Sequence, residues 1–143
     1  MENTKQPSII SSYSSMIKAS LIASTVAGVF LGILMQMKGM LTMLGGESLA
    51  IGWVMHMMIS WIFGLGFGAM TLLSSRYYLV GFIHGVLIWV IGPLLMMPIM
   101  MGMGPMIGEM FTTAQLMNLV THLAFSLILA ALFSRLVNKP KKA

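Results

Sequence analysis

The sequence predicts an all-α integral membrane protein, a bundle of four transmembrane helices. Of the 143 residues, 58% are hydrophobic and only 8% are charged, whereas a soluble domain carries about 25% charged residues. The mean hydropathy of +0.94 agrees with this composition. Four segments reach the length of about 20 apolar residues that a bilayer core requires, and none contains Asp, Glu, Lys or Arg. We expect a single membrane domain over residues 1–143.

The expected helices cover residues 19–37, 49–73, 77–101 and 114–134. The first is longer than the apolar region of a signal peptide, which has about 7–15 residues, so we expect it to be retained. A tight turn of Ser74, Ser75 and Arg76 separates the second and third helices, and the other two connections are longer and rich in Gly and Met. Connections this short make neighbouring helices antiparallel.

The basic residues indicate how the chain is oriented. Short cytoplasmic loops collect Lys and Arg, and seven of the eight basic residues fall on one side of the predicted membrane. We therefore expect a multi-pass protein of the cell (inner) membrane, with residues 1–18 and 135–143 as cytoplasmic tails. The +5 net charge reflects this orientation, and nucleic acid is not an expected partner. The seven residues are Lys5, Lys18, Arg76, Arg135, Lys139, Lys141 and Lys142, and Lys38 lies opposite.

The residue types that catalysis needs are scarce. The chain has no cysteine, which excludes disulfides, thiolate nucleophiles and iron–sulfur clusters. Its acidic residues beyond Glu2 are Glu47 and Glu109, both in the outer connections, and no phosphate-binding loop or nucleophile-elbow pattern is present. We therefore expect no enzymatic activity.

Small residues recur at four-residue spacing on every expected helix. Such spacing lets helix backbones approach closely in lipid, because it removes side-chain bulk from one face. We expect these faces to be the interior seams of the bundle, and the alternative is a permeation path along them. The stripes are Ser20, Ser24, Gly28 and Gly32; Gly52, His56, Ser60, Gly64 and Gly68; Gly81, Gly85, Trp89 and Pro93; and Asn118, His122, Ser126 and Ala130.

A shift of 66 residues aligns the first half of the chain with the second. His56 and Ser60 then fall on His122 and Ser126. Duplication of a helical hairpin would explain this match. It predicts two tandem hairpins related by a pseudo-twofold axis along the membrane normal, as in some transporters.

Residues 52–133 carry a succession of motifs. The pattern His56-Met-Met-Ile-Ser60 is followed by a Gly-rich helix that ends in a Pro-containing turn, and then by His122-Leu-Ala-Phe. In this order the segment resembles the YagU-like family of uncharacterised small bacterial inner-membrane proteins, although Thr121 stands where that family tends to have Gly. The resemblance implies a membrane-bundle fold and brings no established activity.

The candidate site consists of histidines and methionines. His56 and His122 each lie about seven residues, roughly 10 Å of helix rise, inside the outer ends of their helices and so share a level. His84 is expected in the opposite leaflet. Methionines gather in the outer connections, and thioether sulfur together with imidazole suits soft ions such as Cu(I). The predicted metal ligands are His56, His122, Met101, Met103 and Met106.

Other interpretations of these residues stay open. The histidine pair could supply both axial ligands of a b-type haem, with Ser60, Gly64, Ser126 and Ala130 making room for the macrocycle. Alternatively, each histidine is hydrogen-bonded to a neighbouring helix, with Ser60, Ser126 or Asn118 as the candidate partner, and the methionines are flexible apolar filler. The function expected first is a structural or accessory role in the lipid bilayer, in a homo-oligomer or larger complex and without a cofactor. The alternative is a membrane protein that binds copper-type metal or haem b.

Overall fold

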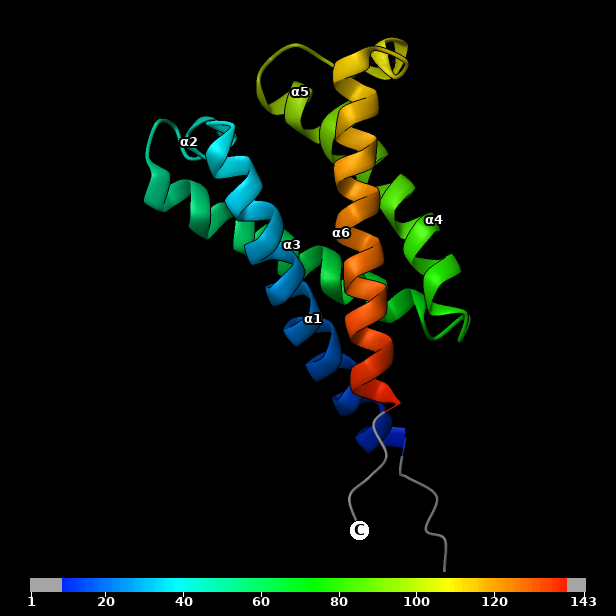
Figure 1. Cartoon of the computed structure of the whole chain (residues 1–143). Coiled ribbons are helices and arrows are strands. Elements are labelled where there is room, and N and C mark those ends of the chain that lie inside the picture. Colours follow the sequence, from blue (N-terminus) through cyan, green and yellow to red (C-terminus); the bar gives the residue numbers. More distant parts are fainter. Residues whose placement is uncertain (1–8, 139–143) are drawn as a thin grey trace, which may run out of the picture.

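The computed structural model describes residues 9–138, which form helices without any strand (Figure 1). Within this range, four helices are long and apolar enough to cross a membrane, which confirms the predicted all-α bundle. The third of these is compound and consists of α4, a π-helix (η1) and α5. The elements are α1 Ile9–Met37, α2 Met40–Leu44, α3 Leu49–Met70, α4 Tyr77–Trp89, η1 Val90–Met96, α5 Met97–Met100, the 3-10 helix η2 Ile107–Glu109, and α6 Thr113–Val137.

Two helices extend beyond the bounds that hydropathy predicted. α1 begins at Ile9 instead of residue 19, and α6 continues to Val137 instead of ending at residue 134. Hydropathy marks the part of a helix that lipid can cover, whereas the backbone hydrogen bonds continue into polar flanks. Residues 9–18 and 135–137 therefore belong to the helices and not to tails. Asn138 caps the end of α6, and residues 1–8 and 139–143 of the predicted tails lie outside the described residues.

Two hydroxyl side chains fix where the returning helices begin. The Ile51 backbone N–H donates to Ser48 Oγ at 3.4 Å, and the Gln115 N–H donates to Thr112 Oγ1 at 3.4 Å. Such caps satisfy backbone donors that lack a partner within the first helical turn. They start α3 at Leu49 and α6 at Thr113, close to the predicted residues 49 and 114.

The helices pair as two hairpins. α3 packs on α1, and the compound helix α4–α5 packs on α6, which follows it in the chain. α1 also packs on α6 and so joins the two hairpins. α3 and α4 touch only lightly, although they are neighbours in sequence. Figure 1 shows that the hairpins lie together where α1 begins and α6 ends, which we call the terminal end, and diverge toward α2, α5 and η2, which we call the loop end.

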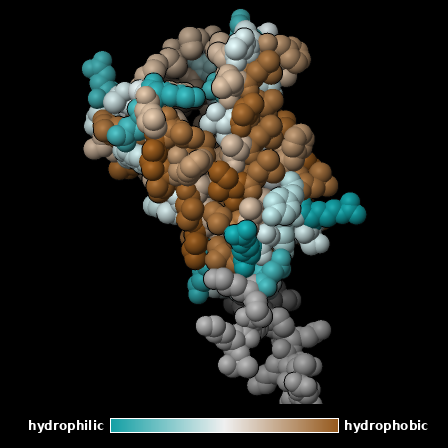
Figure 2. Space-filling view, in the orientation of Figure 1, coloured by the Kyte–Doolittle hydropathy of each residue, from teal (hydrophilic) through white to brown (hydrophobic). Residues whose placement is uncertain are grey.

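The surface agrees with a membrane location. Figure 2 shows hydrophobic residues over the middle of the visible face, with hydrophilic residues gathered toward the two ends. Large apolar side chains on the outside include Ile62, Leu79 and Phe82, which are between 49% and 63% exposed. In water these positions would be unfavourable, and in lipid they are the expected surface.

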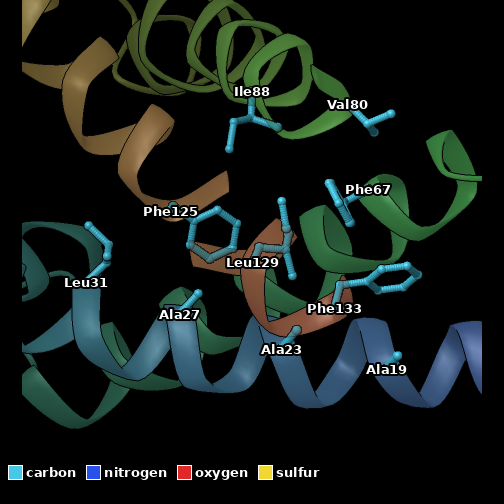
Figure 3. Close-up of a cluster of buried hydrophobic side chains, with 11 residues drawn as sticks. Ala19, Ala23, Ala27, Leu31, Phe67, Val80, Ile88, Phe125, Leu129 and Phe133 are labelled. Atoms are coloured by element: carbon cyan, nitrogen blue, oxygen red, sulfur yellow. The ribbon is translucent and has the colours of Figure 1, made fainter. Parts of the chain in front are cut away.

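The hydrophobic core lies where the two hairpins meet (Figure 3). α1 contributes the small residues Ala19, Ala23 and Ala27, which leave room for larger side chains of α6 such as Phe133. The Phe133 ring is edge-on to Phe67 of α3, with centroids 5.3 Å apart. The cluster also contains Val80 and Ile88 of α4, so the core ties all four spanning helices together.

The predicted small-residue seam between α1 and α3 is confirmed. A Cβ added to Gly28 would lie 2.7 Å from Ser60 Oγ, and one added to Gly64 would overlap Ser24. Ser24 and Ser60 are both buried. Glycine and serine thus alternate across the seam, so the helix backbones approach more closely than larger side chains would allow.

The seam between α4 and α6 departs from the predicted stripe. Gly81 and Gly85 face α6 as expected, and Trp89 is buried, but the next buried positions are Leu94 and Pro98 and not Pro93. The π-helix supplies the reason, because its wider turn adds one residue and moves the buried face by one position. A proline inside the helix removes a backbone donor and favours such an irregular turn.

Candidate functional site

His56 is held between α3 and α1. Its side chain is 9% exposed, and Nε2 lies 2.8 Å from the carbonyl oxygen of Gly28. The Trp53 ring is edge-on to the imidazole, with centroids 6.1 Å apart. The predicted partner Ser60 does not contact the ring, since its hydroxyl donates to the His56 backbone carbonyl at 2.8 Å.

His122 lies on the half of α6 nearer the loop end, where fewer side chains are buried than in the other half. Its Nδ1 is 2.7 Å from the carbonyl oxygen of Asn118, one turn earlier in the same helix. Its Nε2 faces Gly92 of the π-helix, 3.9 Å from where a Cβ would stand. This bond stays within α6, so His122 is not tied to a neighbouring helix through Nδ1. Ser126, another candidate partner of a histidine, bonds to His84.

His84 bridges three helices. Its Nδ1 lies 2.8 Å from Ser126 Oγ on α6, and its Nε2 lies 3.0 Å from the carbonyl oxygen of Phe63 on α3. Ser126 is one turn of α6 from His122, on the side of the terminal end, so His84 contacts α6 farther from the loop end than His122 does.

His56 and His122 are 66 residues apart in the sequence, and each belongs to a different hairpin. Their hydrogen bonds differ, because His56 is tied to another helix and His122 to its own. The two histidines that the predicted repeat aligns therefore do not make equivalent contacts.

The three predicted methionine ligands lie in the connection between α5 and η2. Met101 and Met103 are 58% and 59% exposed, and Met106 is half-buried. The Met106 N–H donates to the Leu94 carbonyl at 2.8 Å, which ties this connection to the π-helix. That carbonyl is available because the residue four positions later, Pro98, has no N–H. The thioethers thus gather at the loop end, outside the helix seams.

Space for a haem macrocycle is not found at the small residues proposed to make room for it. The Gly64 and Ser60 positions are filled by close contact with α1. Ser126 donates to His84, and Ala130 packs against Gly81. These four residues close the seams within each hairpin.

Among residues 9–138, no group of three or more His, Cys, Asp or Glu side chains could hold a metal ion. Glu47 and Glu109 are both exposed in the loop-end connections. Any metal here would therefore depend on the imidazoles and thioethers.

Two features of this region escaped the sequence analysis. The π-helix gives His122 a glycine to face, and its only signal in the sequence is the pair Pro93 and Pro98 inside one apolar segment. Gln115 is buried, and its backbone carbonyl oxygen accepts a hydrogen bond from Trp89 Nε1 at 2.9 Å.

Comparison with models of protein families, with curated proteins and with solved structures found no match for this chain.

Proposed function

We propose that the chain is a small membrane protein with a structural or accessory role, which acts by associating with other membrane-embedded helices and not by catalysis. The basic residues support a location in the cell inner membrane with cytoplasmic termini. Lys18 lies in the first half of α1, Arg135 lies in the last turn of α6, and Arg76 directly precedes α4, whereas Lys38 lies between α1 and α2.

The observation that carries this proposal is the one-sided packing of α3. Of its most apolar 18 residues only 17% are buried, against 44% for α1. Its inward face is fully used against α1, and its sequence neighbour α4 touches it only lightly. A spanning helix bound on one side leaves a long apolar face for lipid or for a second protein. The exposed residues of α3 include Ile51, Val54, Met58, Trp61, Ile62 and Leu65.

A second copy of the chain is the partner we propose for this face. Trp61 supports a protein contact, because its ring is 41% exposed while Nε1 is already satisfied by Thr25 Oγ1 at 2.9 Å. The indole is thereby fixed in orientation and presents a rigid apolar surface. Rigid aromatic side chains are typical anchors of protein interfaces.

Single-cysteine cross-linking tests the proposal, because the chain has no native cysteine to interfere. Ile62→Cys on α3 should form a cross-linked dimer in native membranes. Val120→Cys on α6 is the matched control, since the two side chains are 63% and 58% exposed. Cross-linking to a different protein would favour a larger complex. If neither variant cross-links, α3 faces lipid only and the proposal fails.

A further inference from the structure

Two shallow hollows lie in line on the outer face of α1. Eight α1 residues between Tyr13 and Val26 line them, together with Trp61 of α3. The eight are every fourth residue counted from Tyr13 and from Ser14, and residues four apart share one face of a helix. The two hollows therefore follow each other along α1, and we call them together the α1 groove.

One positive charge lies in the α1 groove without a carboxylate nearby. Lys18 is the only charged residue of α1, and its side chain is exposed. The carboxylates within residues 9–138 are those of Glu47 and Glu109, both in the loop-end connections. About 28 Å of helix rise separates Lys18 from the last residue of α1 on the way to that end. The charge of Lys18 is therefore left for solvent or for a ligand.

The hollow around Lys18 gathers groups that suit a phosphate. It is lined by Tyr13, Ser14, Ile17 and Lys18. Side chains of a helix lean toward its N-terminus, so the stem of Lys18 carries the ammonium toward Tyr13 and Ser14, about one turn earlier. An ammonium and two hydroxyls can all donate hydrogen bonds. Lysine and tyrosine are also typical of the level at which lipid headgroups lie.

The second hollow presents only hydrocarbon. Ile22 and Val26 are 53% and 50% exposed. Trp61 Nε1 donates to Thr25 Oγ1 at 2.9 Å, and that hydroxyl donates to the Leu21 carbonyl at 2.7 Å, so the polar atoms of the hollow are already satisfied. From Lys18 to Val26 the helix rises about 12 Å, close to the half-thickness of about 15 Å of a bilayer core. The α1 groove thus has a cationic end and an apolar part of about one leaflet in depth.

We propose that the α1 groove binds an anionic phospholipid, with the phosphate at Lys18 and one acyl chain along Ile22 and Val26 against Trp61. Charge complementarity selects a lipid with a net negative headgroup, because a zwitterionic headgroup brings its own cation to the phosphate. Anionic lipids of the cytoplasmic leaflet are attracted to basic residues close to the membrane surface. The site does not depend on the proposed dimer, since α1 supplies most of the groove and α3 supplies the dimer face.

Fluorescence quenching by brominated lipid tests the site, because Trp61 lines the part that would hold the acyl chain. The protein is placed in vesicles of phosphatidylcholine with brominated acyl chains, and a rising fraction of that lipid is replaced by unbrominated phosphatidylglycerol. Bound phosphatidylglycerol should protect Trp61 from bromine. We expect Trp61 fluorescence to recover ahead of the phosphatidylglycerol fraction, with a preference of about fivefold for the anionic lipid. The signal of the other two tryptophans is measured in Trp61→Phe and subtracted.

Two variants separate a bound lipid from a general effect of surface charge. In Lys18→Gln the fluorescence should recover in proportion to the phosphatidylglycerol fraction. Arg135→Gln is the matched control, since Arg135 is exposed, is predicted on the same side of the membrane and does not line the groove. It should keep the preference of the parent.

Three results would overturn the proposal. The first is proportional recovery in the parent, and the second is an equal loss of preference in the Lys18 and Arg135 variants. The third is a Trp61 that stays unquenched even in pure brominated phosphatidylcholine, because a protein segment and not a lipid would then cover the groove.

Discussion

At the scale of single residues, some polar side chains cross helix boundaries and others bond within their own helix. His84 joins α4 to α6 and α3, and His56 joins α3 to α1. Ser60 and His122 bond to carbonyls of their own helices. Ser20 does neither, because its hydroxyl is fully buried and Oγ has no hydrogen-bond partner among residues 9–138. A buried polar side chain thus contributes differently to the stability of the bundle according to whether a hydrogen-bond partner lies opposite it.

Replacing His84 should destabilise the bundle. His84→Leu removes both bonds and leaves the Ser126 hydroxyl and the Phe63 carbonyl without their partner, which should cost about 1–2 kcal/mol at membrane values of about 0.6 kcal/mol per hydrogen bond, up to about 1.7. Unfolding in a denaturing detergent measures this loss. Ser20→Ala is the contrasting variant, since it removes an unpaired hydroxyl and should leave stability unchanged or raised. A larger loss for Ser20→Ala than for His84→Leu would contradict these assignments.

The sequence could identify the polar residues that face inward but not the partner of each. Four-residue spacing correctly placed His56, Ser60 and Ser126 on interior faces. It offered Ser126 as a partner for a buried histidine without deciding which one, and the structure pairs the hydroxyl with His84. Partner choice depends on how far antiparallel helices slide past each other, and spacing within one helix carries no information about that distance.

At the scale of elements, the helices are held by close backbone contact along glycine-containing seams. Gly64→Ala should cost about 1–3 kcal/mol, because the new methyl group overlaps Ser24 and forces α1 and α3 apart. Gly108→Ala is the control, since no atom lies within 4 Å of its added Cβ. Adding Ser24→Gly to Gly64→Ala should recover part of the loss in a double-mutant cycle. Equal stability of the Gly64 and Gly108 variants would show that the seam does not exist.

The π-helix yields a second prediction at this scale. In Pro93→Ala the backbone N–H returns and the segment can relax to an ordinary α-helix, which would rotate Leu94 out of the seam. A cysteine at position 94 should then react with a maleimide faster in the Pro93→Ala background than in the parent, where Leu94 is buried. Unchanged reactivity would mean that packing and not Pro93 maintains the π-turn.

At this scale the sequence patterns predicted the seams between helices but not the places where a seam departs from regular helical spacing. Hydropathy and spacing both assume one uniform helix over residues 77–101, so they placed Pro93 in the stripe. They also expected the first Gly-rich connection only to link two helices, whereas Gly45 in that connection packs so closely on Gly52 that a Cβ would overlap that backbone.

At the scale of the whole molecule, the distribution of basic residues predicts the orientation. Reporter fusions at Ser75 and at the C-terminus should be active in the cytoplasm, and fusions within 38–48 and 102–112 should report the opposite side. Alkaline phosphatase and green fluorescent protein give complementary signals for this comparison. A C-terminal fusion that reports the outside would reverse the orientation and place the methionine-rich connections in the cytoplasm.

The segment that connects the two hairpins, residues 71–76, bears on how the two hairpins associate. Leu73 in this segment is 89% exposed, and the helices on either side of it barely touch. The two hairpins therefore associate mainly through non-covalent contacts between them. The connecting segment contributes chiefly by raising the local concentration of one hairpin around the other. Two separate chains, residues 1–74 and 75–143, should therefore find each other when expressed together, and a tag on one should retrieve the other. Each hairpin expressed alone should be inserted but easily degraded, because its half of the core would be left facing lipid.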